Sequence, residues 1–317
     1  MGRNLQKQLL GMALMAAAAA IASGNASAAP APLASEDIVL TVPGFADFLA
    51  VDGENVWITN KGRVELWSRQ AKLAEVAMAK PCGGMTVAFG SLWVADCQHR
   101  RVNRIDTGMS SFIAVIPTGL TTVTGGELNV VSGAGSVWAP SDDAGMIARI
   151  DPATNTVIAS VKVDPGTTYL AYGEGALWAV SSKAQTVQKI DPATNRVVGK
   201  ARLGKQPAFL AAGEGGVWVQ EQGDGTLARV DPRTVEVTGR TKVGADWMYG
   251  DIDTGGGKVW LRTTADQVMV VVDPKSMAVL GRFGKPAGSG ALRYVGPGLW
   301  TSAHDVHTLS WWGTGGK

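Results

Sequence analysis

Seven tryptophans recur along this chain at nearly regular intervals. They are separated by 36, 45, 40, 40, 42 and 40 residues and stand at Trp57, Trp93, Trp138, Trp178, Trp218, Trp260 and Trp300. Five of them are followed thirteen residues later by an aspartate, as in Arg149-Ile150-Asp151-Pro152. A period near 40 residues that is held seven times indicates a repeat architecture, and four short strands per repeat are typical of a β-propeller blade.

The unit around Trp218 shows how one blade is built. Short runs of β-branched and small apolar residues lie at 208–213, 216–220, 226–230 and 235–241, and Gly, Asp and Pro turns separate them. This pattern predicts a four-stranded antiparallel sheet. We expect each repeated tryptophan to pack between neighbouring sheets, and each Asp-Pro turn to be held by the aspartate side chain bonding to nearby amides.

The two ends of the repeat complement each other. The last unit has only three strands, at 290–295, 299–302 and 307–311, whereas an extra strand at 38–42 precedes the first unit. We therefore predict an all-β, seven-bladed β-propeller in which the N-terminal strand completes the last blade and removes the exposed sheet edges. The predicted divisions are a signal peptide at 1–28, a short segment at 29–37, one propeller domain at 38–312 and a flexible tail at 313–317.

The first residues have the pattern of a secretion signal. Arg3 and Lys7 form a basic start, an apolar run follows at 9–21, and Ala26-Ser27-Ala28 is a small-residue cleavage site. We expect 1–28 to be removed and the protein to be periplasmic or secreted, with a retained anchor as the alternative. The remaining chain has 27 basic and 27 acidic residues. This balance argues against nucleic acid or an anionic membrane as a partner, and we expect a soluble monomer without membrane insertion.

The two cysteines fall in one predicted hairpin. Cys82 begins the inner strand of the second blade, Cys97 ends the next strand, and the chain turns between them at Phe89-Gly90. This arrangement sets the cysteines opposite each other, so an oxidising compartment favours a disulfide. A reactive thiol pair or a metal site is the alternative.

The repeat motif resembles that of a known group of propellers. The core Gly-x-Gly-x-[Val/Leu]-Trp-[Val/Ala], followed by [Arg/Lys]-Ile-Asp-Pro-Ala-Thr-Asn, is clearest at 133–155 and 173–195. It resembles the repeat of the streptogramin lyase-like and YVTN-type bacterial propellers over about 38–312. These families include a metal-dependent lyase that opens a cyclic peptide lactone, and lactone hydrolases. The lyase carries histidines near the start of late inner strands, where this chain has none at 207–208, 247–249 and 289–290.

The functional residues are expected at one end of the channel. In a propeller, the loops that enter the inner strands and those between the second and third strands emerge on one face and carry function. The His304-Asp305-x-His307 cluster, if it faces a carboxylate there, suits a divalent metal or acid–base work, although a histidine in a surface turn is more often solvated. The candidate catalytic residues are His304, His307, Glu127 and Asp251.

Aromatic residues interrupt the aliphatic pattern at the starts of several inner strands. Such residues at a channel mouth favour stacking on a planar or sugar-like ligand, and packing between blades is the alternative. The candidate ligand-binding residues are Trp247, Tyr249, Tyr169, Phe209, Arg293 and His99, and Asp47 is predicted to reach the same mouth.

Two functions remain open from the sequence. The first is an exported propeller that binds a small ligand or a partner protein at the mouth of its channel. The second is a metal-dependent lyase or lactone-opening hydrolase, with a divalent cation as its cofactor and the candidate catalytic residues around it.

Overall fold

The computed structural model describes residues 33–119, 127–141, 144–245, 250–263, 268–285 and 288–315. The predicted signal peptide at 1–28 lies outside these residues, and Pro32–Lys317 form one compact unit. Apart from one short 3-10 turn, η1 (Gln222–Asp224), the described elements of this unit are strands. Among them there is no helix with the length and apolar character that a membrane span requires.

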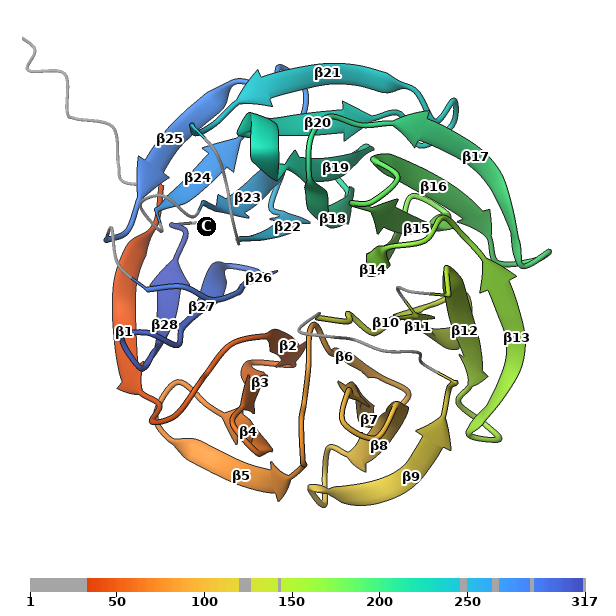
Figure 1. Cartoon of the computed structure of the whole chain (residues 1–317). Coiled ribbons are helices and arrows are strands. Elements are labelled where there is room, and N and C mark those ends of the chain that lie inside the picture. The colour runs from red at the N-terminus through yellow and green to blue at the C-terminus, as the bar shows by residue number, and fades with distance from the viewer. Residues whose placement is uncertain are drawn as a thin grey trace, which may run out of the picture. The chain divides into compact units, whose positions relative to one another are not determined.

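Seven four-stranded antiparallel sheets follow one another around a common axis (Figure 1). Blade one consists of β2 (Leu49–Asp52), β3 (Asn55–Asn60), β4 (Arg63–Trp67) and β5 (Lys72–Ala77). Blade two consists of β6 (Thr86–Ala88), β7 (Ser91–Asp96), β8 (Arg101–Asp106) and β9 (Ser111–Pro117). Blade three consists of β10 (Val131–Gly133), β11 (Ser136–Ser141), β12 (Met146–Asp151) and β13 (Thr156–Lys162).

The second half of the ring repeats this order. Blade four consists of β14 (Thr167–Gly173), β15 (Ala176–Ser181), β16 (Thr186–Asp191) and β17 (Arg196–Arg202). Blade five consists of β18 (Pro207–Gly213), β19 (Gly216–Glu221), β20 (Thr226–Val230) and β21 (Val237–Lys242). Blade six consists of β22 (Asp251–Gly255), β23 (Lys258–Arg262), β24 (Met269–Val272) and β25 (Val279–Phe283). Blade seven contains β26 (Leu292–Val295), β27 (Gly298–Ala303) and β28 (Thr308–Gly313).

The fourth strand of blade seven comes from the other end of the propeller unit. β1 (Ser35–Thr41) pairs with β28 in an antiparallel register that runs from Ser35 opposite Gly313 to Thr41 opposite Thr308. The first and last strands therefore lie side by side and close the ring, as Figure 1 shows. The predicted closure is confirmed, and the closing strand begins three residues earlier than expected.

Four of the seven repeated tryptophans have a glycine five residues earlier, and this glycine has a packing role. The carbonyl oxygen of Gly133 accepts the indole N–H of Trp138 at 3.0 Å, and Gly255 does the same for Trp260 at 2.9 Å. A Cβ atom on Gly133 would lie only 2.0 Å from the Tyr172 ring of the next blade. The motif needs glycine here because a neighbouring inner strand passes too close for any side chain.

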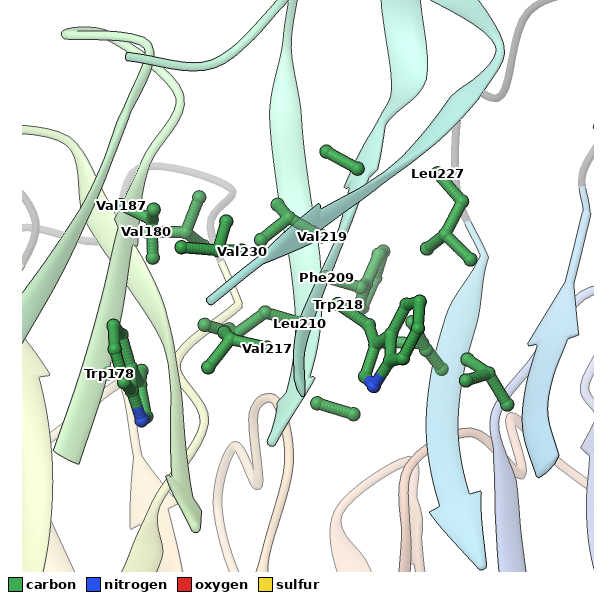
Figure 2. Close-up of a cluster of buried hydrophobic side chains, with 14 of the residues drawn as sticks. Trp178, Val180, Val187, Phe209, Leu210, Val217, Trp218, Val219, Leu227 and Val230 are labelled. Carbon is green, nitrogen blue, oxygen red and sulfur yellow. The ribbon is translucent and has the colours of Figure 1, made fainter. Parts of the chain in front are cut away.

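The core lies between the blades. All seven repeated tryptophans are at most 1% exposed. Figure 2 shows one such layer, in which Trp178 and Val187 from blade four belong to the same apolar cluster as Trp218 and Leu227 from blade five. The predicted position of the tryptophans between sheets is therefore confirmed.

The Asp-Pro turns also connect the blades. The Asp151 carboxylate accepts a hydrogen bond from the backbone amide of Ala153 at 2.8 Å, so this aspartate stabilises the turn, as predicted. Arg149 covers the Trp138 ring at 4.8 Å and donates across to the Pro192 carbonyl oxygen at 2.6 Å in the equivalent turn of blade four. Equivalent bonds from blade two to three and from blade four to five make these turns clamps between blades.

Candidate functional site

A cavity of about 380 Å³ opens at one end of the ring. Its walls are the segments that lead into the inner strands of blades one, three, five, six and seven, together with the turn between β27 and β28. The lining residues are Phe45, Asp47, Phe48, Glu127, Phe209, Gly250, Ser289, Gly290, Ala291 and His304. The structure thus brings together the two classes of loop that the sequence predicted to share a face, and we call this end of the ring the channel mouth.

The turn at Gly44-Phe45 shapes the outer wall of this cavity. Gly44 has a φ of +114°, and the Asn60 side chain accepts the Phe45 amide at 2.6 Å. A Cβ atom on Gly44 would lie 2.3 Å from the Asn60 oxygen, so the turn requires glycine. The Phe45 ring is 49% exposed and stacks on His304 with a centroid separation of 4.0 Å. Blade one and blade seven therefore meet at an aromatic lip.

Two carboxyl groups stand inside the cavity. Burial, together with the charges of Glu127 and Asp251, raises the pKa of Asp47 to about 8 against the opposing charge of Arg262. Burial also raises the pKa of Glu127, and this effect outweighs the hydrogen bond that Tyr169 donates to it. At neutral pH the Asp47 carboxyl is therefore mainly protonated, so it can donate a proton or a hydrogen bond as well as accept one.

Tyr169 supports this carboxyl pair from blade four. Its hydroxyl donates a short hydrogen bond to Glu127 Oε2, and its ring contacts Phe209 with a centroid separation of 4.3 Å. Burial and the neighbouring carboxylates hold the pKa of Tyr169 well above its ordinary value. The hydroxyl thus remains a donor that fixes the orientation of Glu127.

Asp251 and Arg293 form a link between blades six and seven. The Asp251 carboxylate accepts the backbone amides of Ile252 and Leu292, each at 2.9 Å, and also pairs with Arg293. Neither residue lines the cavity at the mouth. Arg293 instead faces a central cavity of about 170 Å³ that the inner strands surround. The acceptor atoms of Asp251 are thus engaged in holding two inner strands together.

Arg262 positions one wall of the site, and the sequence analysis did not select it. The buried guanidinium donates to the backbone carbonyl oxygens of Ser302 and Gly288, the latter at 2.5 Å. Burial lowers its pKa to about 10 against the charges of Asp305, Asp251 and Asp47. Arg262 therefore anchors the segment that contributes Ser289, Gly290 and Ala291 to the cavity.

The sequence matches no protein-family model and no curated protein. Its fold is shared with solved structures. The virginiamycin B lyase of Staphylococcus aureus is 14% identical, with a TM-score of 0.75 over 87% of this chain and 98% of that one. A streptogramin B lyase structure is 13% identical, with a TM-score of 0.74 over 88% and 96%. BamB of Moraxella catarrhalis is 15% identical, with a TM-score of 0.65 over 85% of each chain.

This chain has the seven-bladed propeller fold of the streptogramin B lyases. The resemblance read from the repeat motif is thereby confirmed for the fold. At 13–15% identity the similarity shows the fold alone. The activity depends on the residues of the site, because one propeller scaffold hosts many unrelated functions.

The three histidines of this propeller do not gather at one point. His304 lies in the cavity, where burial lowers its pKa against the opposing charge of Asp305. His307 is exposed at a φ of +57° and does not line the cavity. The His99 ring lies 2.7 Å from Asp96 Oδ2 beside the disulfide. Of the three histidines only His304 lines the cavity that Glu127 also lines.

A divalent metal at this site would need several protein ligands that converge on one point. The described residues contain no group of three or more histidine, cysteine, aspartate or glutamate side chains that could hold a metal ion. Glu127 and His304 share the cavity, whereas Asp251 is engaged elsewhere. The candidate set therefore does not fit a metal centre with three protein ligands, and we derive no step through one.

A second cavity of about 470 Å³ adjoins the first. It shares Phe45, Asp47, Phe48 and Glu127 with the first cavity and extends over the region between blades one and two. Its other lining residues are Thr59, Asn60, Lys61, Gly62, Ala79, Lys80, Pro81, Cys82 and Gly83.

The predicted disulfide between Cys82 and Cys97 is present, with a Cα–Cα distance of 5.9 Å. A β-bridge between Pro81 and Asp96 flanks it. Because Cys82 lines the second cavity, the disulfide stiffens one wall of the channel mouth.

Sequence reasoning placed some site residues and missed others. Phe209 and Glu127 line the cavity as predicted, and Tyr169 contacts both, whereas Trp247 and Tyr249 lie outside the described residues. Phe45 and Phe48 were missed, and Asp47 was placed at the mouth but not chosen. The signal that was available is the run Phe45-Ala46-Asp47-Phe48, which brings two aromatic residues and a carboxylate into a single inner-strand entry.

Proposed function

We propose that this protein is exported and binds a small organic ligand in the cavity at its channel mouth. The observation that carries the proposal is the cavity itself, which combines the rings of Phe45, Phe48 and Phe209 with the polar groups of Asp47 and Glu127. A volume of about 380 Å³ and a mainly apolar wall with a few convergent polar groups are typical of small-molecule sites.

A small ligand is favoured over a partner protein because the polar groups are recessed. Phe209 and Tyr169 are each only 8% exposed, and the Tyr169 hydroxyl donates to Glu127. A molecule small enough to enter the mouth reaches these groups, whereas a flat protein surface contacts mainly the lip at Phe45.

Export is supported by two features. The leader pattern at 1–28 precedes the propeller, and Cys82 and Cys97 form a disulfide. Disulfides persist mainly in oxidising compartments such as the periplasm and the extracellular space.

The test is a binding screen with a library of small aromatic and polar compounds, read by thermal unfolding and by ligand-observed NMR. We expect hits whose binding is lost in Phe45→Ala and is kept in Phe112→Ala. Phe112 is a matched control because it is 45% exposed but lies on the outer strand β9. A library without any hit, or hits that are indifferent to Phe45, would argue against the proposal.

A lyase or lactone-opening hydrolase is the second candidate. Its support is the proximity of a carboxyl group with a pKa of about 8 to an imidazole in one cavity, since such groups can transfer protons near neutral pH. One neighbour in fold is a catalytically inactive virginiamycin B lyase with quinupristin. Quinupristin therefore belongs in the library, with mass spectrometry of the recovered compound after incubation. Elimination leaves its mass unchanged but alters its chromatographic retention, and hydrolysis adds one water.

A further inference from the structure

The two adjoining cavities at the channel mouth differ in charge along their length. They share the wall formed by Phe45, Asp47, Phe48 and Glu127, so together they form one elongated trough. The first cavity adds His304, and the second adds Lys61 and Lys80. The trough, defined as these two cavities, thus has an acidic centre with aromatic walls and a basic end over blades one and two.

The basic end carries two uncompensated cations. Lys61 lies in the turn between β3 and β4, and Lys80 precedes β6; both residues are exposed. Within the described ranges neither ammonium group takes part in an ion pair or a side-chain hydrogen bond. The nearby carboxylate Glu65 is paired instead with Arg63 at 2.5 Å. An anionic group entering this end therefore meets two free positive charges.

Among the described residues no cation forms an ion pair with either carboxyl group of the acidic centre. No donor among the described residues bonds to the Asp47 carboxyl, and Glu127 receives only the neutral Tyr169 hydroxyl. The charge of Arg262 acts on Asp47, but its guanidinium donates to backbone carbonyl oxygens, and Arg293 pairs with Asp251. An ammonium group placed here contacts the oxygen atoms of both carboxyl groups, and its charge favours the ionised form of Asp47, which is mainly protonated in the free protein.

The aromatic walls suit the same occupant. Phe45, Phe48 and Phe209 surround the acidic centre, and an ammonium group over a phenylalanine face is attracted by the ring quadrupole. In the second cavity, Phe45 and Phe48 together with Ala79 and Pro81 provide an apolar surface for the part of a ligand that extends toward the lysines. The trough therefore complements a positive group and a negative group separated by an apolar linker.

We propose that the trough binds a zwitterion, with an organic ammonium group at Asp47 and Glu127 and an anionic group at Lys61 and Lys80. This inference rests on the proposed function and names the chemical class of its ligand. The two charged ends select for a zwitterion over a singly charged molecule, because a molecule with only one charge leaves the other end of the trough unpaired.

The experiment uses calorimetric titration with ω-amino carboxylic acids of increasing chain length, from aminobutanoate to aminododecanoate. At the best length, the matching alkylamine, alkanoate and alcohol are titrated as well. We expect the zwitterion to bind at least about tenfold more tightly than any of the three, because each end contributes a charge-assisted bond.

Variants assign the two ends. Asp47→Asn with Glu127→Gln should reduce the affinity for the zwitterion to that of the alkanoate, and Lys61→Met with Lys80→Met should reduce it to that of the alkylamine. Lys205→Met is the control, because Lys205 is an exposed lysine that does not line the trough. Its affinity should match that of the unaltered protein.

The outcomes separate this inference from the proposed function. If the alcohol, the amine or the acid binds as tightly as the zwitterion and Phe45→Ala abolishes binding, the cavity is a ligand site but the zwitterion is wrong. Zwitterion binding that is unchanged in the lysine pair would also overturn the inference. If no probe of any charge binds, both the inference and the proposed function fail for this class of compound.

Discussion

Asp47 holds its proton in a setting that opposes ionisation. Its pKa is 3.8 in the unfolded chain and about 8 in the folded protein, because burial and the charges of Glu127 and Asp251 outweigh the attraction of Arg262. Between these two pH values the folded state binds a proton that the unfolded state has lost. Stability contributed at this site is therefore present below about pH 4 and is lost as the pH rises toward 8.

Asp47→Asn tests this linkage, since asparagine stays neutral at every pH. Each pH unit between the two pKa values is worth at most about 1.4 kcal/mol, and the partial exposure of Asp47 reduces this. We expect the free energy of unfolding of the variant to gain about 2 kcal/mol on the unaltered protein between pH 5 and pH 8, measured by urea unfolding.

Two other groups that line the cavity also have shifted pKa values. Glu127 lines the same cavities with a raised pKa, and His304 in the first cavity has a lowered one. Asp231→Asn is the control, because the amides of Arg233 and Thr234 lower the pKa of this turn carboxyl and leave it ionised in both states across this range. A difference between Asp47→Asn and the unaltered protein that does not change with pH would contradict the assignment.

The strands were largely predictable from the sequence, because the forces that form them are local. In blade five the predicted runs 208–213, 216–220 and 226–230 differ from the observed strands by no more than one residue at either end. Turn glycines and Asp-Pro pairs mark the boundaries, and the alternation of side chains fixes the faces.

The site was less predictable, because its residues come from different blades. The rings of Phe45 and His304 stack on each other although the two residues are 259 positions apart in the sequence, and no local sequence pattern predicts that contact. Asp251 and Arg293 occupy positions that suit a site, and only their hydrogen bonds reveal a structural link between strands. Sequence position placed Asp47, Glu127 and Phe209 at the end of the ring where the cavity lies. Whether a residue lines the cavity or belongs to the core depended on tertiary contacts.

The clamps between blades are uneven around the ring, which gives a matched pair of variants. Arg149 donates to the Pro192 carbonyl oxygen at 2.6 Å and to Asn195 at 2.9 Å, both in the next blade. Arg229 occupies the same place over its own tryptophan, but its recorded hydrogen bond goes to Gly215 in the same blade at 3.2 Å.

We expect Arg149→Met to lower the free energy of unfolding by about 1–3 kcal/mol, since it removes both bonds to the next blade, together with the bonds to Ser136 and Ala134 in its own blade. Arg229→Met should cost less than about 1 kcal/mol, because methionine keeps the contact with the tryptophan ring and no bond between blades is lost. Urea unfolding of the two variants side by side makes the measurement. Equal losses would show that the bonds between blades add nothing beyond packing.

Closure of the ring couples all seven blades. In an open array of repeats each unit contacts only its neighbours, and the two end units expose a face and an edge. Here β1 and β28 join the ends, so every blade has two neighbours. Ile38 and Leu40 from β1 pack against the cluster that contains Trp300 and Trp311, which connects the closing strand to the core of blade seven.

A chain that lacks residues 1–41 tests what this closure contributes. It loses the ladder between β1 and β28 and the apolar contacts of Ile38 and Leu40, and it leaves β28 as an open edge. We expect the free energy of unfolding to fall by about 3–6 kcal/mol and the protein to associate through the exposed edge. Thermal unfolding and size-exclusion chromatography follow the two effects.

A synthetic peptide of residues 33–42 completes the experiment. If β1 acts only as the missing strand, the peptide should bind the shortened chain, raise its melting temperature with increasing concentration and restore the elution volume of the parent protein. A chain that lacks only residues 1–31 is the control, because it retains β1, and its unfolding should match that of the parent. The opposite outcome is a shortened protein that has the elution volume and the melting temperature of its control. It would mean that the ring holds without the closing strand, and that the layers of tryptophan between the blades maintain it.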